Sequence, residues 1–292
     1  MKRDREAVAS TVGTIMALLV FLTFLSLFTN SYIPVWMQAN ERSHMNEVLN
    51  QFGYLKGQID IMIKSAKITG ESDIVMYSPI TLGADGIPIF ASPTAGQLVF
   101  VPMGSSSSSF SLRFNYTLSN SRVEVSESGG GIIQLWAPNR YYVQQWVAYE
   151  NGAIIVKQPD GQVIRAVPEI SLKKINDKVN IVITQINLVG SNATIGGTGS
   201  IGLNLNLIGS DSDSFSVGYG NDYNVTIKII TRFGNAWEQY LRDLCSKSNL
   251  LPTDYSINSR ESGDGLSDIV FQIKNAGTVR YDRCYVEISI QT

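Results

Sequence analysis

The side chains best suited to acid–base or nucleophilic chemistry are few in this chain: one histidine, His44, and two cysteines, Cys245 and Cys284. A Ser-His-Asp or Cys-His arrangement could draw only on His44, which lies far along the chain from either cysteine. We therefore predict no catalytic residue and no enzyme activity, and interpret His44 as an exposed surface residue. An anchored hydrolase is the weakest alternative, because no motif supports it.

A glycine motif could in principle hold a dinucleotide. Gly197, Gly199 and Gly202 have the G-x-G-x-x-G spacing, but that fingerprint needs a strand before it and a helix after it, with the helix N-terminus facing the pyrophosphate. Residues 203–207 instead alternate leucine and asparagine, as a strand does. We predict a glycine-rich turn and no bound cofactor.

Three aspartates, Asp211, Asp213 and Asp222, could offer carboxylate oxygens to calcium. Their spacing is not that of an EF-hand, since the glycine at the turn and the distal glutamate are missing. We predict a solvated polar loop and no metal ion, with calcium binding as the less favoured reading.

The two cysteines have two readings that depend on compartment. In a reducing cytosol Cys245 and Cys284 would be ordinary buried thiols, whereas outside a membrane a single disulfide between them is favoured. The same outer location makes Asn115, Asn192 and Asn224 candidate glycosylation acceptors, because each begins an Asn-x-Thr triplet.

The N-terminal segment determines where the rest of the chain lies relative to a membrane. After a short charged head (residues 1–6), no Asp, Glu, Lys, Arg or His occurs between Ala7 and Asn40. Ala7 to Phe28 is long enough for a helix across a hydrocarbon core, which needs about 20 residues, and Tyr32 and Trp36 follow where an interfacial aromatic belt would lie. We predict a single transmembrane helix over 7–31, with the N-terminus in the cytoplasm; a cleaved signal peptide and a buried core helix are the alternatives.

An amphipathic stalk helix is predicted over 32–65. Met45, Val48, Phe52, Leu55 and Ile59 recur mostly at spacings of three and four, with charged residues between them. Only Pro34 interrupts the run, and it would kink the helix rather than end it. The apolar stripe has two open readings: a packing seam between subunits, or the face on which the chain's own head docks.

The start of this helix carries a resemblance. The stretch Ala7-Val-Ala-Ser-Thr-Val-Gly-Thr-Ile15, preceded by basic residues and followed by the apolar run, resembles the N-terminal domain of archaeal type IV pilins and archaellins. The resemblance covers about the first 60 residues and implies an archaeal surface setting, a β-rich head and assembly through the helix. Glu6 departs from the pattern, because family members carry a small residue before the cleavage point.

The remainder, residues 66–292, predicts an extracytoplasmic β-rich domain. Many short alternating runs with turn signals favour an antiparallel β-sandwich-like head, including a three-stranded meander over 141–167 and one helix over 234–247. The net charge of −2 offers no electrostatic reason to expect nucleic acid.

These features favour a mainly β protein with a long N-terminal helix: a pilin-like, non-enzymatic surface protein in the cell membrane or a pilus. Its expected partners are membrane lipid and like subunits, through Val12, Ile15, Leu19 and Leu22. The alternative is a single-pass anchored binding module for envelope glycans or proteins.

Overall fold

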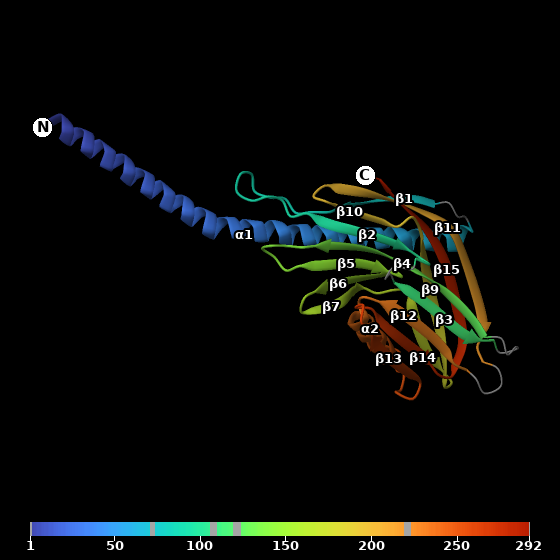
Figure 1. Cartoon of the computed structure of the whole chain (residues 1–292). Coiled ribbons are helices and arrows are strands. Elements are labelled where there is room, and N and C mark those ends of the chain that lie inside the picture. The colour runs from blue at the N-terminus through green and yellow to red at the C-terminus, as the bar shows by residue number, and fades with distance from the viewer. Residues whose placement is uncertain (1, 71–73, 106–109, 119–123, 219–222, 292) are drawn as a thin grey trace.

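One uninterrupted helix dominates the N-terminal quarter of the chain. The computed structural model describes residues 2–70, 74–105, 110–118, 124–218 and 223–291, with only the backbone described for 2–9. Helix α1 (Lys2–Thr69) contains 68 residues and includes Pro34, so it is about 100 Å long at 1.5 Å per residue. Figure 1 shows its N-terminal part projecting away from the head and its C-terminal part enclosed by strands.

A five-stranded sheet lies on one side of the enclosed helix. Its order is β1-β11-β15-β9-β8, and every pair is antiparallel except β15 with β9, which are parallel. The strands are β1 (Ile74–Thr81), β8 (Ile170–Ile175), β9 (Lys178–Gly190), β11 (Ser200–Ser216) and β15 (Ala276–Gln291). Strand β1 forms one edge of this sheet.

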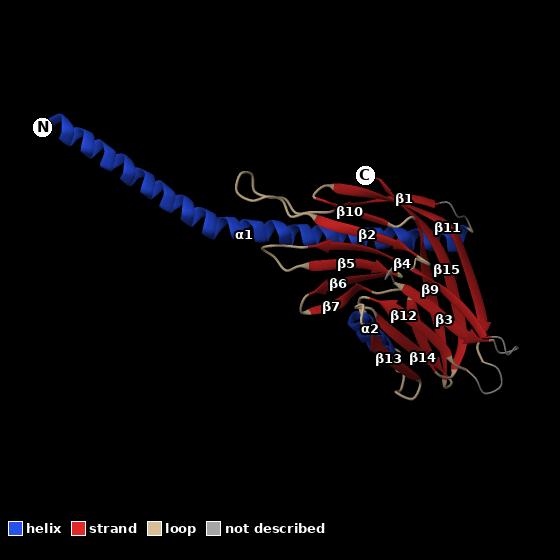
Figure 2. Ribbon diagram, viewed as in Figure 1, coloured by secondary structure: helices blue, strands red, loops and turns tan. Residues whose placement is uncertain are grey.

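A ten-stranded antiparallel sheet completes the head (Figure 2). Its main path is β13-β14-β12-β3-β4-β5-β6-β7, and β2 and β10 join it at β4. The strands are β2 (Gly96–Pro102), β3 (Ser111–Thr117), β4 (Glu124–Ala137), β5 (Gln145–Glu150), β6 (Ala153–Gln158), β7 (Gly161–Ala166), β10 (Ala193–Gly197), β12 (Val225–Thr231), β13 (Tyr255–Glu261) and β14 (Ser267–Ile273).

Strand β4 changes partners halfway along its length. Its first half pairs with β3 and its second half with β2 and β5. Gly130 and Gly131 lie at the change, with φ of 136° and 105°. L-residues rarely adopt such values, so glycine lets one strand leave one partner and join two others.

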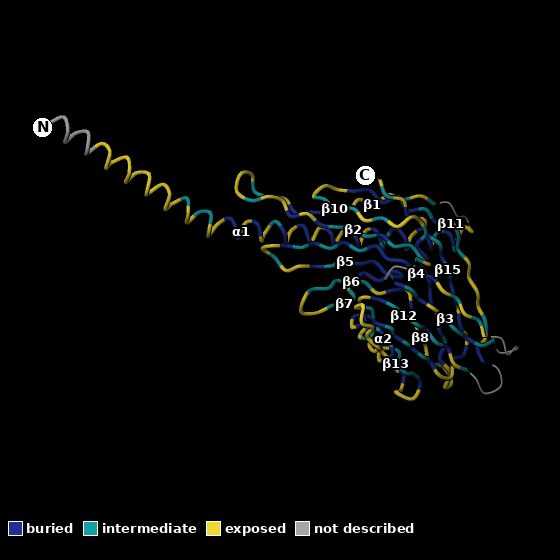
Figure 3. Tube along the Cα trace, in the orientation of Figure 1, coloured by how far each residue is buried: buried dark blue, intermediate teal, exposed yellow. Residues whose placement is uncertain are grey.

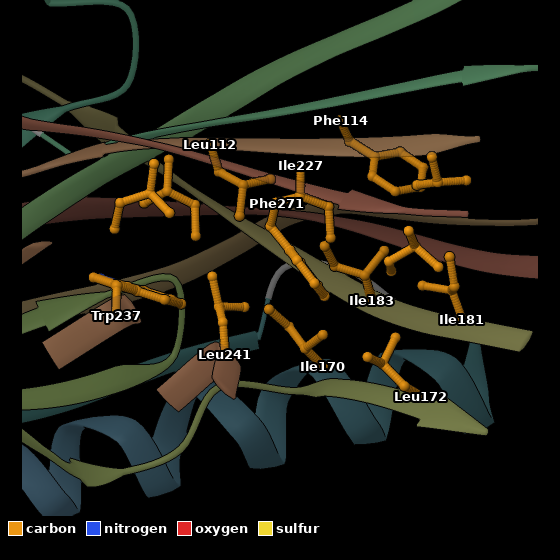
Figure 4. Packing of buried hydrophobic residues seen from close by; sticks show 14 of the residues in the cluster. Leu112, Phe114, Ile170, Leu172, Ile181, Ile183, Ile227, Trp237, Leu241 and Phe271 are labelled. Atoms are coloured by element: carbon orange, nitrogen blue, oxygen red, sulfur yellow. The ribbon is translucent and has the colours of Figure 1, made fainter. Parts of the chain in front are cut away.

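The head contains two hydrophobic clusters, and the burial pattern along the chain is drawn in Figure 3. One forms around the enclosed part of α1. The other forms under α2 (Gly234–Lys247), where Trp237 and Leu241 face Ile170, Ile183 and Phe271 from the strands (Figure 4). The chain therefore builds one core on its N-terminal helix and a second on its short C-terminal helix.

Most sequence predictions for the fold are confirmed. The helix over 234–247 and the meander are present, and Asn151 and Gly152 turn between β5 and β6 with positive φ, as a two-residue hairpin requires. Thr198 and Gly199 turn between β10 and β11, which confirms the glycine-rich turn. One prediction is wrong: Asp211 and Asp213 lie within β11 rather than in a loop. Asp222, the third residue of that prediction, is outside the described residues.

Candidate membrane anchor and its collar

The free part of α1 exposes an apolar surface on all sides. The predicted contact residues Val12, Ile15, Leu19 and Leu22 are each about half exposed or more, and so are most of the large apolar residues between them. No residue of its most apolar stretch is buried, so the reading of this segment as a core helix is wrong. The segment is long and apolar enough to cross a membrane once.

Three threonine hydroxyl groups on this segment are satisfied within the helix. Thr14 donates to the carbonyl oxygens of Ser10 and Thr11, Thr23 donates to Leu19 at 2.7 Å, and Thr29 donates to Leu25 at 2.9 Å. A polar group that finds its partner inside its own helix does not need water. The threonines therefore do not prevent this helix from lying in lipid.

Aromatic side chains gather where the free helix approaches the head. The ring of Phe28 contacts Phe24, Tyr32 and Trp36 along α1, with centroids 5.7–6.5 Å apart. Tyr32 and Trp36 are exposed and follow the apolar run directly. Tyrosine and tryptophan are enriched at membrane–water interfaces, so this cluster has the composition of an interfacial belt.

The second half of α1 is the central element of its own hydrophobic core. Met45, Val48, Phe52, Leu55 and Ile59 are all buried against the head, and the helix contacts β1, β5, β6 and β11. Of the two readings of the apolar stripe, docking of the chain's own head is confirmed for this part. Burying these side chains fixes the helix relative to the strands.

Polar side chains on α1 also form hydrogen bonds with the edge strand β1. Gln51 accepts from the backbone N–H of Thr81 at 2.8 Å and donates to its hydroxyl, and Gln58 donates to the carbonyl oxygen of Tyr77 at 2.8 Å. His44 Nε2 lies 3.0 Å from the carbonyl oxygen of Thr81. His44 is only 6% exposed, so its expected surface position is wrong: the edge strand covers it.

A buried carboxylate ties the helix to two loops at the point where α1 leaves the head. Glu41 accepts hydrogen bonds from the Thr94 hydroxyl at 2.7 Å and from the backbone N–H groups of Arg140, Tyr141 and Tyr142 at 2.7–3.0 Å. We call these five residues the collar. Burial by itself would raise the pKa of Glu41, but these four hydrogen bonds outweigh it and lower the pKa. The carboxylate is therefore held in its charged form.

An ion pair between half-buried Lys67 and buried Asp282 fixes the other end of the helix. Lys67 Nζ lies 2.7 Å from Asp282 Oδ2 on β15, and Ser212 and Arg280 also donate to this carboxylate. Burial alone would raise the pKa of Asp282, but the hydrogen bonds from Lys67 and Ser212 and the charges of Lys67 and Arg280 lower it. Together with the collar, this pair clamps the enclosed half of α1 at both ends.

The cysteines do not form the predicted disulfide. Cys245 and Cys284 are both free and buried, Cys245 in the cluster under α2 and Cys284 in the cluster around α1. Burial raises the pKa of the Cys245 thiol to about 12 and also raises that of Cys284. They are core residues, because the two chain segments that carry them face different cores.

The candidate glycosylation acceptors differ in accessibility. Asn192 and Asn224 are exposed and lie just outside strands. Asn115 is half-buried within β3, where it accepts from Ser126. Asn192 and Asn224 are therefore the two that a modifying enzyme could reach in the folded head.

A shallow groove of about 540 Å³ lies on the head between β2, β4 and β5. Gln97, Gln134 and Thr194 line it beside Trp136 and Trp146, whose rings stack on each other with centroids 6.3 Å apart. No group of three or more potential metal-ligating side chains occurs within the described ranges. The groove therefore presents amide and hydroxyl groups next to two indole rings.

The fold and these contacts define a class: a β-rich head built around the C-terminal half of a helix whose N-terminal half is suited to a membrane. Residues 118–283 match a family of unknown function (DUF7289). The match spans more than half of the chain, so the chain belongs to this family. No curated protein and no solved structure matches the chain.

Proposed function

We propose that this chain is a pilin-like, non-enzymatic surface protein that its N-terminal helix holds in the cell membrane, with the β head on the extracytoplasmic side. The observation that carries the proposal is the division of α1 into an exposed apolar half and a half buried in the head. A rigid helix of this kind holds the head directly at the membrane surface. Basic residues precede the span, which supports a cytoplasmic N-terminus.

The exposed half of α1 is also the surface proposed for assembly. A subunit that leaves the bilayer must bury its apolar surface elsewhere, and packing against the same segment of other subunits provides that burial. Val12, Ile15, Leu19 and Leu22 are the proposed contacts. The head, clamped to α1 at both ends, would then be displayed outward at a fixed angle.

Substitution of Leu19 tests the anchor. Leu19→Asp places a carboxylate in the middle of the span, at a cost of about 3 kcal/mol for insertion. Leu251→Asp on the head is the matched control, because both leucines are 57% exposed. We expect the Leu19 variant to be lost from the membrane fraction and the Leu251 variant to be retained; equal retention would refute the anchor.

Electron microscopy of shed surface material, with antibody against the head, tests assembly. Filaments that carry the label are expected, and a membrane-bound protein without labelled filaments would refute assembly while leaving the anchor intact. That result would favour the second candidate function, an anchored glycan-binding module.

The groove beside Trp136 and Trp146 is the observation that favours this second candidate, because planar amides next to indole rings are suited to sugar hydroxyls and ring faces. Titration of the full chain with envelope oligosaccharides, followed by tryptophan fluorescence, tests it. Loss of the response in a Gln97→Ala, Gln134→Ala variant is the expected result, and no response in the wild type refutes it.

A further inference from the structure

The loop between β1 and β2 ends in an apolar tip, defined here as residues 87–90. The tip reads Ile87-Pro88-Ile89-Phe90 and has no charged residue. Ile89 is fully exposed, at 102% of its reference area, and Phe90 is 44% exposed. In Figure 1 the loop projects from the head along the same direction as the free part of α1.

The tip has a strained backbone that burial inside the chain does not explain. Ile87 accepts from the backbone N–H groups of Phe90 and Ala91 at 3.1 and 2.9 Å, which closes a tight turn. Ile89 follows Pro88 with φ of +72°, a position where type II turns normally have glycine or asparagine. A β-branched residue is costly there, yet its side chain gains no contact within the described chain. Such a conflict between local preference and sequence indicates a functional constraint.

The position of the tip is set by a contact with the helix. The ring of Phe90 packs against the ring of Phe28, with centroids 5.5 Å apart. Phe28 ends the apolar run that begins at Ala7, and these 22 residues span about 33 Å, close to the roughly 30 Å of a hydrocarbon core. When α1 crosses the bilayer, Phe90 therefore lies level with the outer edge of the hydrocarbon.

The base of the loop is fixed by the collar. Arg140 Nη2 donates to the carbonyl oxygen of Ser92 at 2.7 Å, and Thr94 donates to Glu41. On the other side, Asn40 donates to the carbonyl oxygen of Asp85 at 3.2 Å. The tip is thus held in one orientation beside α1 before any ligand binds.

We propose that this tip is a second membrane contact, with Ile89 and Phe90 inserted among the lipids of the outer leaflet beside α1. The proposal rests on the membrane anchor proposed above. Burial of Ile89 in lipid offsets the strain at that residue. Two contacts side by side, rather than one helix alone, fix the tilt of the head and prevent it from rotating about the helix axis.

Site-specific fluorescence tests the contact in the full chain reconstituted into phosphatidylcholine vesicles. An environment-sensitive label is placed on Ile89→Cys, and on Ile68→Cys as a control. Ile68 is 85% exposed and lies about 60 Å farther along α1 than Phe28. Wild-type protein, treated with the same label, is the control for labelling of the buried native thiols. We expect lipid-borne spin label to quench position 89 and aqueous iodide to quench it several-fold less than position 68.

Other outcomes overturn the proposal. Equal iodide quenching at positions 89 and 68 shows that the tip is in water. If the label at position 89 is protected from iodide only at high protein density, and lipid-borne spin label does not quench it, the tip contacts a neighbouring subunit instead. A third label on Leu19→Cys separates the two proposals: lipid quenching at 19 but not at 89 refutes the tip contact alone, and no quenching at either refutes the anchor.

Discussion

Glu150 provides the sharpest test of the energetics of the head. Its carboxylate is completely buried and accepts from the Thr231 hydroxyl at 2.8 and 3.0 Å and from the Trp237 indole at 2.8 Å. No ion pair to it occurs in the described part of the chain. Burial raises the pKa of Glu150 from its ordinary 4.5 to about 7, and the hydrogen bonds from Trp237 and Thr231 only partly oppose this.

The sign of the effect on stability follows from proton binding. Below pH 4.5 the folded and unfolded chains both carry the proton. Between pH 4.5 and about 7 the unfolded chain releases it while the folded chain keeps it, so Glu150 makes the fold less stable as pH rises. Because one pKa unit is worth about 1.4 kcal/mol, the full loss is about 3 kcal/mol and is complete above pH 7.

A Glu150→Gln variant removes this dependence. The amide has nearly the same shape, stays neutral, and can accept from Trp237 and donate to the Thr231 hydroxyl. We expect the free energy of unfolding of the variant, relative to wild type, to increase by about 3 kcal/mol between pH 4.5 and pH 8.

Urea unfolding of the full chain in detergent micelles, followed by tryptophan fluorescence across this pH range, measures the difference. The comparison cancels the other titrating groups, and Glu287→Gln on the exposed face of β15 is the control that should parallel wild type. If the Glu150→Gln and wild-type curves differ by a constant at every pH, the reasoning is refuted.

Three further predictions concern the clamps and the thiols. Glu41→Gln replaces one acceptor oxygen by an amide NH2 group, which cannot accept from the backbone N–H groups that face it, and should lower the free energy of unfolding by about 2–4 kcal/mol at pH 7. Because the pKa of Glu41 is lowered in the fold, the difference should shrink as pH falls through that pKa, and an unchanged urea midpoint at pH 7 would contradict this. Lys67→Met removes the closest cation of the Asp282 carboxylate, to which Ser212 and Arg280 still donate, and should cost about 1.5–3 kcal/mol in the same assay. A Lys67→Met, Asp282→Asn double variant should recover part of the loss. Cys245 and Cys284 should react with a maleimide only after unfolding, as followed by intact mass without reductant, and a mass matching the oxidised protein would contradict the free thiols.

The sequence by itself determined the features that depend on local pattern. An uncharged apolar run, a stripe at helical spacing and Asn-Gly between two alternating segments each specify their structure without distant contacts. These patterns predicted the long helix, the meander and the helix over 234–247. They also predicted that the head would be mainly β, because alternation and turn residues recur throughout residues 66–292.

Only the tertiary structure decided what depends on partners far along the chain. The collar joins Glu41 to backbone groups about a hundred residues away, and His44 is buried because an edge strand happens to cover it. The spacing of two cysteines in the sequence does not show whether they lie in different cores or form a disulfide. Strand β4 changes partners at glycines that, in the sequence, have the composition of a loop. Strand pairing and burial are set by contacts across the whole chain, and no local pattern records them.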